Sequence, residues 1–183
     1  MNPGVPDRSL SDDELAMAAR SDRRAFELLY HRYLDRVYRY AFSKTADPAI
    51  AEELTSSIFL DALEGLNRYS PRGTFAAWLF TIARRRCADY HRSSSPLPLI
   101  VEALPAIERH PEQESDRKAL FLRLEKILKM LPKEELDMLR LRYAVDLSHA
   151  EIGQIIGKSE AATKMALSRL IRRLRGLWEI QNE

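Results

Sequence analysis

The sequence predicts an all-α protein of two small helical domains, a four-helix N-terminal domain at 11–92 and a helix-turn-helix domain at 116–178. Three observations support this fold class. Apolar residues recur at the spacing of amphipathic helices through most of the chain. Capping boxes mark helix starts at 11–14 and 148–151. Four prolines and no glycine fall within 93–115, which predicts a Pro-rich linker or a partly packed connection.

The N-terminal domain begins with the capping box "SDDE", which opens a short helix. Apolar residues at helical spacing over 26–41 predict a long second helix, and "ADP" at 46–48 ends it. The same spacing over 54–66 predicts a third helix. After a loop that contains Pro and Gly, a fourth helix is expected over about 74–91.

The C-terminal domain is predicted to start with helices at about 116–130 and 133–143, separated by a proline. The second capping box then opens a short helix, and the turn "GKS" contains Gly157. Ser159 is positioned to cap a longer, basic helix. A short helix, a glycine turn and a longer basic helix together form the helix-turn-helix pattern.

Charge is distributed unevenly, although the formal net charge is only +2. The segment 47–64 contains five acidic residues and neither Lys nor Arg. The segment 84–92 contains four arginines and one aspartate, and 164–175 contains five basic residues and no acid. One acidic and two basic surfaces are therefore expected, which indicates partners of two kinds.

The composition argues against an enzyme, a metal or cofactor site and a membrane protein. The four histidines are scattered without metal-ligand spacing. Cys87 is the single cysteine, so no internal disulfide can form and a reduced, cytoplasmic setting is expected. Nearby arginines could activate its thiol, but its place toward the edge of an apolar helix arc favours a buried structural thiol. The longest uncharged run has 11 residues, too few to span a bilayer, and the polar N-terminus is no signal peptide.

The fourth helix has two faces. One arc is apolar and is expected to face the core: Phe75, Trp78, Leu79, Ile82, Ala83 and Tyr90. The opposite arc carries cations: Thr81, Arg84, Arg85, Ala88, His91 and Arg92. Arg86 falls within the apolar arc, where a pair with Asp89 is expected. The cationic arc is either a solvated helix face or a surface for a polyanion.

The loop before this helix favours single-stranded nucleic acid, because it adds an aromatic ring and more cations. Its members are Asn67, Arg68, Tyr69, Arg72 and Thr74. Tyr69 is either a stacking platform for a base or an anchor for the loop.

The last helix is also two-faced, and its polar arc suits the major groove of DNA. That arc comprises Ala161, Ala162, Met165, Ser168, Arg169, Arg172 and Arg173. The small and apolar members suit thymine-methyl contacts, and Arg169 suits guanine or phosphate. An ordinary amphipathic helix is the alternative interpretation.

Four blocks of sequence follow one another along the chain: "FELLYHRYLDRVYRYAF", "AEELTSSIFLDALEGL", "YSPRGTFAAWLFTIARRRCADYHR" and "LPKEELDMLRLRYAVDLSHAEIGQIIGKSEAATKMALSRLIRRLR". In this order they resemble the sigma-70 family of bacterial transcription initiation factors, in its two-domain extracytoplasmic-function (ECF) form. The resemblance covers most of 12–178. It implies a sigma2-like domain, a sigma4-like domain and a non-enzymatic function without a cofactor.

The resemblance also implies partners and site residues. The partners are core RNA polymerase (the clamp helices of its β′ subunit and its β flap), promoter DNA and an anti-sigma protein of the kind that often inhibits such factors. Polymerase-binding residues by this comparison are Glu52, Glu53, Leu54, Ser57, Ile58 and Asp61. Residues for the melted −10 element are Asn67, Arg68, Tyr69, Arg72, Trp78, Thr81, Arg84, Arg85, Ala88 and Arg92. Residues for the duplex −35 element are Ser148, Ala161, Ala162, Lys164, Met165, Ser168, Arg169, Arg172 and Arg173.

The chain departs from the family pattern in three places: Ser56 with Ser57 in the clamp block, "AAT" at 161–163, and Ala166 in the next turn. These departures leave the promoter sequence open. The alternative function is a stand-alone helix-turn-helix regulator. Such a protein usually carries a ligand-sensing or dimerisation domain, and the first ninety residues look different.

Overall fold

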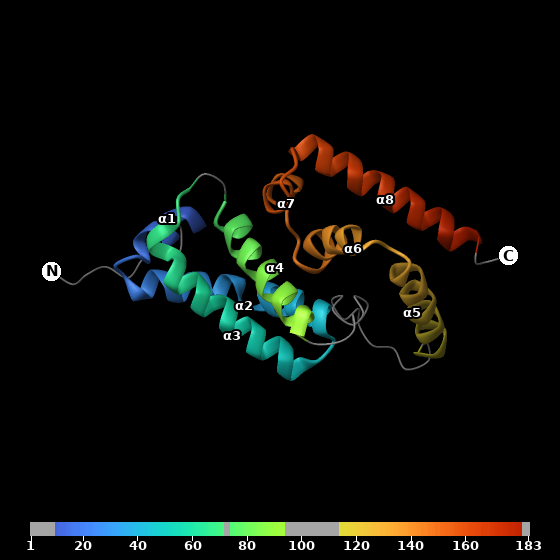
Figure 1. Cartoon of the computed structure of the whole chain (residues 1–183), viewed down its shortest axis with the longest axis horizontal. Coiled ribbons are helices and arrows are strands. Elements are labelled where there is room, and N and C mark those ends of the chain that lie inside the picture. The colour runs from blue at the N-terminus through green and yellow to red at the C-terminus, as the bar shows by residue number, and fades with distance from the viewer. Residues whose placement is uncertain (1–9, 72–73, 94–113, 181–183) are drawn as a thin grey trace.

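A computed structural model describes residues 10–71, 74–93 and 114–180 and confirms the all-α fold, since these residues form helices and no strand. Figure 1 shows the N-terminal helices gathered on one side of the molecule and the C-terminal helices on the other. Most of the expected linker, 94–113, lies outside the described residues.

Within residues 10–71 and 74–93, the N-terminal half forms four α-helices and a short 3-10 turn. They are α1 (Asp12–Ala18), α2 (Arg23–Thr45), α3 (Pro48–Gly65), the 3-10 turn Leu66–Arg68 and α4 (Phe75–Ser93). The capping box at Ser11 is present, and its hydroxyl accepts a hydrogen bond from the Glu14 amide. Between α2 and α3 the chain turns through Ala46, which adopts a left-handed conformation with φ of 49°. Asp47 then caps α3 by accepting from the Ile50 amide at 3.1 Å.

The C-terminal half contains α5 (Glu114–Lys129), α6 (Lys133–Leu139), α7 (His149–Ile156) and α8 (Glu160–Ile180). The single helix predicted over 133–143 is wrong at its end, because α6 passes into a π-helical turn, Arg140–Ala144. The wider turn brings Arg140, Leu141 and Ala144 all into the interior.

The segment 136–141 is buried at every position, although an amphipathic helix at a protein surface leaves one face exposed. Its surroundings explain this. The π turn packs against α2 of the N-terminal half, and α6 packs against α8 on its other side. Two charged side chains, Asp137 and Arg140, are therefore buried at the centre of the molecule.

The two halves contact each other directly. The start of α4 packs against α7, as Figure 1 shows, and α2 packs against the π turn. Buried apolar residues from both halves form one continuous cluster. The two helices that the sequence predicts to face DNA, α4 and α8, therefore belong to halves that pack directly on each other.

Candidate nucleic-acid interface

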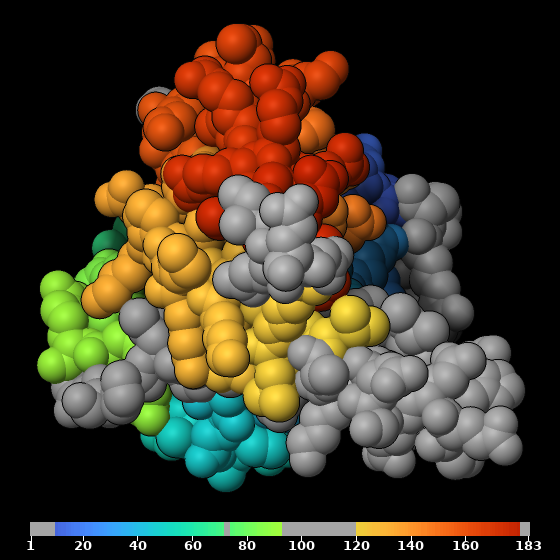
Figure 2. All heavy atoms as spheres, turned by 90° about the vertical axis from the view of Figure 1, so that its right-hand side faces the viewer, coloured from blue at the N-terminus to red at the C-terminus, as the bar shows by residue number. Residues whose placement is uncertain are grey.

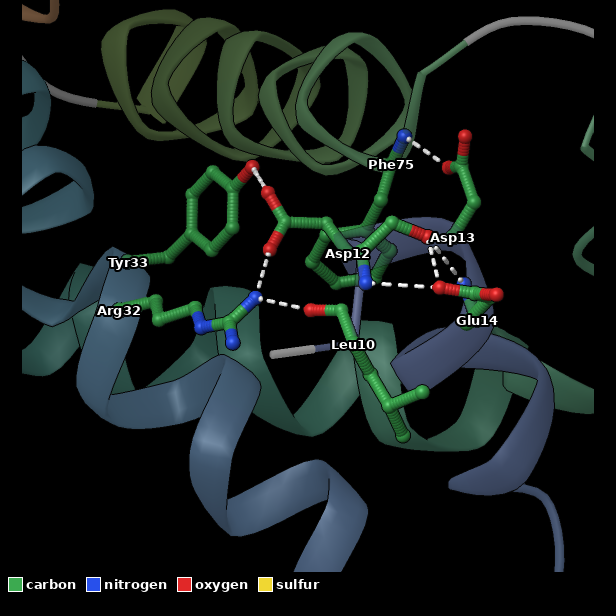
Figure 3. Close-up of polar contacts among 8 residues, drawn as sticks. Leu10, Asp12, Asp13, Glu14, Arg32, Tyr33 and Phe75 are labelled. Carbon is green, nitrogen blue, oxygen red and sulfur yellow. Dashed lines mark hydrogen bonds and ion pairs between the residues drawn. The ribbon is translucent and has the colours of Figure 1, made fainter. Parts of the chain in front are cut away.

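The start of α4 is fixed by the acidic residues of α1, which Figure 3 shows. Asp12 lies between Tyr33 and Arg32, and it accepts a hydrogen bond from Arg32 at 2.7 Å. Asp13 accepts from the backbone amide of Phe75 at 2.8 Å, which caps the first turn of α4. The negative charge also suits the positive end of the α4 dipole.

Tyr69 is an anchor of the loop in this structure, the second of the two roles that the sequence left open. Its side chain is only 2% exposed, and its ring contacts those of Phe75 and Trp78 with centroids 5.9 and 5.0 Å apart. Its hydroxyl donates to Asp13, and burial together with this bond raises the pKa of Tyr69. Arg20 donates to its carbonyl oxygen. The ring therefore offers no free face to a base in this conformation.

The cationic face of α4 lies at the surface as predicted. Thr81, Arg85, Ala88 and Arg92 are exposed, and so are Asn67 and Arg68 in the loop; Arg72 lies outside the described residues. The Arg85 side chain is 85% exposed, with Asp89 as a distant partner at 3.9 Å. Arg84 differs, because its guanidinium donates to Asp137 of α6 at 2.8 Å.

The expected pair of Arg86 with Asp89 is wrong. Arg86 instead reaches across to α3 and makes two hydrogen bonds to the Asp61 carboxylate. These bonds hold the pKa of Asp61 below its usual range. Asp89 pairs with Arg85 and Arg92 on its own helix. One acidic residue of the predicted polymerase surface is therefore already matched by a cation of the same domain.

A cavity of about 370 Å³ lies between α3 and α4. Its lining residues are Asp61, Glu64, Gly65, Arg68, Trp78, Ile82, Arg85, Arg86 and Asp89. Trp78 can approach α3 because Gly65 has no side chain, and a Cβ there would lie 3.1 Å from the indole ring. Trp78 offers one flat surface and Arg68 and Arg85 offer two cations, features that suit a nucleotide, while the carboxylates Asp61 and Asp89 of the lining are paired with arginines. The size is within the range of small-ligand sites.

The sequence assigned Trp78, Arg68 and Arg85 of this lining to the −10 site, and it did not assign the other lining residues there: Asp61, Glu64, Gly65, Ile82, Arg86 and Asp89. Gly65 ends a helix and Ile82 belongs to an apolar arc, so neither residue type signals a binding site by itself. The spacing of Glu64 and Arg68 could have placed them near one another at the end of α3.

The exposed face of α3 differs from the one that the sequence suggested. Glu52 and Glu53 are exposed, and Ser57 is half-buried. Leu54 and Ile58 are 8% and 0% exposed, so they belong to the core of the domain. The apolar side chains at the surface of α3 are instead Leu60 and Leu63, at 60% and 46% exposure. Their helical spacing from Glu53 and Ser56 is the signal that could have identified them.

The helix-turn-helix has the predicted local structure. Ser148 caps α7 through a complete capping box, and Gly157 ends that helix in the left-handed region with φ of 71°. Gly153 is required by the close approach of the turn, because a Cβ there would lie 2.5 Å from the carbonyl oxygen of Lys158. Thr163, buried in α8, donates to the Ser159 carbonyl at 2.9 Å.

The polar arc of α8 is at the surface, as the sequence predicts for a recognition helix. Its exposed members are Ala161, Ala162, Lys164, Met165, Ser168, Arg169, Arg172 and Arg173, and Ser148 is exposed at the start of α7. Met165 is 59% exposed. Arg173 pairs with Glu135 of α6. Figure 2 shows α8 projecting at the top of the face that it views.

Other kinds of site are not indicated within the described parts of the chain. No group of His, Cys, Asp or Glu side chains there is arranged to hold a metal ion. No helix in these segments has the length and apolarity needed to cross a membrane. Cys87 is buried, and burial raises the pKa of its thiol to about 12, as expected for a structural cysteine.

Two family models match the chain, Sigma-70 region 2 over residues 29–96 and Sigma-70 region 4 over 121–174. The first match contains α3 and α4, and the second contains the helix-turn-helix. Among curated relatives, the ECF RNA polymerase sigma factor BldN of Streptomyces coelicolor is 36% identical over 166 residues. That alignment covers 88% of this chain and 62% of BldN.

Solved structures share the fold at lower sequence identity. CnrH, in complex with the cytosolic domain of CnrY, matches with a TM-score of 0.65 and 21% identity, covering 92% of this chain and 97% of CnrH. The sigma factor RpoE of Bartonella quintana, in complex with the anti-sigma factor NepR, matches with a TM-score of 0.60 and 21% identity, covering 85% and 97%. The ECF RNA polymerase sigma factor ShbA of Streptomyces griseus is 34% identical over 138 residues, which cover 70% of this chain and 71% of ShbA. With this relative and the two family matches, the chain belongs to the sigma-70 family of RNA polymerase sigma factors, in its ECF branch.

Proposed function

We propose that this chain binds core RNA polymerase and directs it to promoters, with α4 and its loop at the melted −10 element and α8 at the duplex −35 element. The observation that carries the proposal is the pair of exposed cationic faces, one in each half of an ECF sigma factor. Cationic faces neutralise DNA phosphates. The face of α4 with its loop suits a separated strand, and the face of α8 suits the major groove of a duplex.

Polymerase binding is proposed for the outer face of α3. Glu52 and Glu53 supply negative charge, and Leu60 with Leu63 supplies exposed apolar area. An apolar centre with a charged rim is the usual composition of a protein interface. The polymerase-binding residues proposed from the sequence are therefore revised. Leu54 and Ile58 are buried in the core beneath this face, so we propose Leu60 and Leu63 in their place.

At the −10 element, we propose that the α3–α4 cavity receives an unstacked base. Trp78 forms one wall, and Arg68 and Arg85, which line the same cavity, are proposed to hold the adjoining phosphates. We assign to Tyr69 the role of supporting Trp78 in the wall of this cavity. Its ring is buried and packs on Trp78, so it does not itself stack on a base.

At the −35 element, the first turns of α8 present Ala161, Met165 and Arg169 to the groove. Arg172 lies further along the helix and is proposed to contact phosphate. Arg173 has a competing partner in Glu135, so it contributes less than Arg172.

An anti-sigma protein is proposed as a further partner. RpoE, a protein of the same fold, was solved with the anti-sigma factor NepR, and that precedent supports the proposal without defining the surface used here. Affinity purification of the full chain from its own cells, followed by identification of stoichiometric partners, tests this expectation.

Reconstituted transcription tests the main proposal. Core polymerase with the full chain should initiate from a subset of a genomic promoter library, and core polymerase alone should not. If the chain were a stand-alone helix-turn-helix regulator, it would bind DNA, but initiation by core polymerase would not require it. Failure to form a complex with core polymerase would contradict the proposal.

A further inference from the structure

The lining of the α3–α4 cavity contains three carboxylates, and one of them differs from the other two. Asp61 and Asp89 each form ion pairs with arginines of α4. Glu64 is exposed, and within the described residues it forms neither a hydrogen bond nor an ion pair. Its carboxylate is therefore available to accept hydrogen bonds from a molecule that enters the cavity.

The stability of α3 does not explain a glutamate at this position. Glu64 lies in the last turn of α3, which ends at Gly65, so its charge faces the negative end of the helix dipole. Arg68 follows four residues later and lines the same cavity, but these two described side chains form no ion pair. A carboxylate that is unfavourable for its own helix and has no cation bonded to it is a candidate for ligand recognition.

The wall next to Glu64 determines how a base would lie. The indole of Trp78 lies against Gly65, the residue that follows Glu64, since a Cβ at Gly65 would be 3.1 Å from the ring. A base that stacks on Trp78 is parallel to the indole, so its hydrogen-bonding groups point sideways rather than toward the ring. Glu64 is therefore expected at the edge of the base, where those groups are.

The chemistry of the bases makes a carboxylate selective at this edge. An ionised carboxylate only accepts hydrogen bonds. Adenine, cytosine and guanine each carry an exocyclic amino group that donates, whereas the exocyclic oxygens of thymine only accept. The single N–H of thymine lies between two such oxygens, which a carboxylate repels. Arg68 and Arg85 only donate, so they do not distinguish the bases in this way.

We propose that Glu64 is a specificity-determining residue of this cavity: it accepts a hydrogen bond from the exocyclic amino group of the unstacked base and thereby excludes thymine. The proposal rests on the function proposed above for the α3–α4 cavity. It deepens that function by naming the chemical class of base that the cavity takes. Arg68 and Arg85 hold the strand through its phosphates, and Glu64 reads the base.

The test uses holoenzyme assembled from core RNA polymerase and the full chain. Its DNA is a library of duplexes with an unpaired bubble of random bases, and sequencing of the bound fraction gives the preference at each unpaired position. We expect thymine to be depleted at one position by at least about tenfold, the effect of a hydrogen bond to a charged group. Glu64→Gln should remove most of this depletion, because an amide also donates and so accepts thymine.

Base analogues show whether the amino group is the feature that is read. At the selected position, purine replaces adenine or 2-pyrimidinone replaces cytosine, which removes only the amino group. Wild-type holoenzyme should lose affinity by about tenfold, and Glu64→Ala holoenzyme should bind both forms alike. Glu27→Gln is the matched control, because Glu27 is an exposed carboxylate of α2 outside the cavity lining. It should keep the wild-type preference.

The outcomes separate the role of Glu64 from the proposed function. If wild-type holoenzyme selects unpaired bases and both Glu64 variants select them identically, the role of Glu64 is overturned and the function stands. A gain in affinity of Glu64→Gln for all bubbles alike, with unchanged preference, also overturns it, since the carboxylate then only repels phosphate. If wild-type holoenzyme does not form, or selects no unpaired base, the function proposed for the cavity fails and the role of Glu64 fails with it.

Discussion

Single residues decide how the loop before α4 is built, and Asp13 has the central position. Its carboxylate accepts from the Tyr69 hydroxyl and from the Phe75 amide, so one side chain joins α1, the loop and the start of α4. Buried hydrogen bonds to Asp13 therefore hold the loop in place. Such a network stabilises the fold most when every polar group in it has a partner.

Truncation of Tyr69 distinguishes an anchor from a stacking platform. Tyr69→Ala should lower the free energy of unfolding by about 3–5 kcal/mol, as loss of other buried aromatic rings does. Tyr69→Phe should lower it by about 1–3 kcal/mol, because only the bond to Asp13 is lost. Urea unfolding monitored by circular dichroism gives both values, with exposed Asn67→Ala as the control. Wild-type stability of Tyr69→Ala would show that the ring is not an anchor.

Two glycines provide a matched pair for the helix-turn-helix. A Cβ at Gly153 would lie 2.5 Å from the backbone oxygen of Lys158, whereas Gly176 has nothing within 4 Å. We expect Gly153→Ala to lower the free energy of unfolding by about 1–3 kcal/mol through overpacking. Gly176→Ala should raise it by about 0.5–1 kcal/mol, because alanine is the better helix former. Equal effects of the two substitutions in thermal unfolding would contradict the tight turn.

At the scale of helices, α3 has one face in the core and another available to a partner. Leu60→Ala combined with Leu63→Ala should weaken binding to core polymerase by about tenfold or more, since exposed apolar residues at an interface centre carry much of its energy. Stability should change little. Leu54→Ala should do the reverse, costing about 2–5 kcal/mol of stability as a buried leucine does. Fluorescence anisotropy with core polymerase and urea unfolding separate the two effects. Normal polymerase affinity of the double variant would remove α3 from the interface.

The exposed arc of α8 should separate base reading from phosphate contact. Met165→Ala and Arg169→Ala should change which duplex sequences are bound, with about 1–3 kcal/mol at stake if Arg169 contacts guanine in bidentate fashion. Arg172→Ala should weaken binding to all sequences alike and reduce the salt slope by about 1. Arg173→Ala should have a smaller effect because Arg173 pairs with Glu135. Binding of the full chain to a randomised duplex library at two salt concentrations measures both. Identical sequence preferences in wild type, Met165→Ala and Arg169→Ala would show that this arc does not read bases.

At the scale of the whole molecule, the features that the sequence predicted well are those with local causes. Capping boxes, the stop after α2 and the glycine turn depend on neighbouring residues, so the helices and the helix-turn-helix appear near their predicted bounds. On α3, the helical spacing of Leu60 and Leu63 from Glu53 and Ser56 could have marked them as exposed, whereas Leu54 lies on the buried face. Periodicity could not show that the segment 136–141 is buried at every position. Burial of Asp137 depends on Lys44 and Arg84, which lie far away in the sequence.

Acid should weaken the contact between the halves, and the sign follows from Asp137. Burial alone would raise its pKa, but the charge of Lys44 and the hydrogen bonds from Lys44, Arg84 and Tyr40 hold this pKa below the usual range. Its stabilisation is therefore fully present above the pKa of a free aspartate, about 3.9. That stabilisation is lost as the pH falls through the lower pKa of the folded chain. The facing groups Tyr40, Lys44, Arg84 and Arg140 keep their protons throughout this range. His91, whose pKa is lowered by burial and by the charges of Lys44 and Arg140, gains its proton below its usual pKa in both proteins. The difference in urea midpoint between wild type and Asp137→Asn should therefore be constant from neutral pH to about pH 4.5 and shrink below about pH 4. Other carboxylates with lowered pKa values, Glu14 and Asp61, titrate alike in both proteins and cancel from the difference. A difference that stays constant down to the acid limit of folding would mean that the charge of Asp137 does not hold the two halves together.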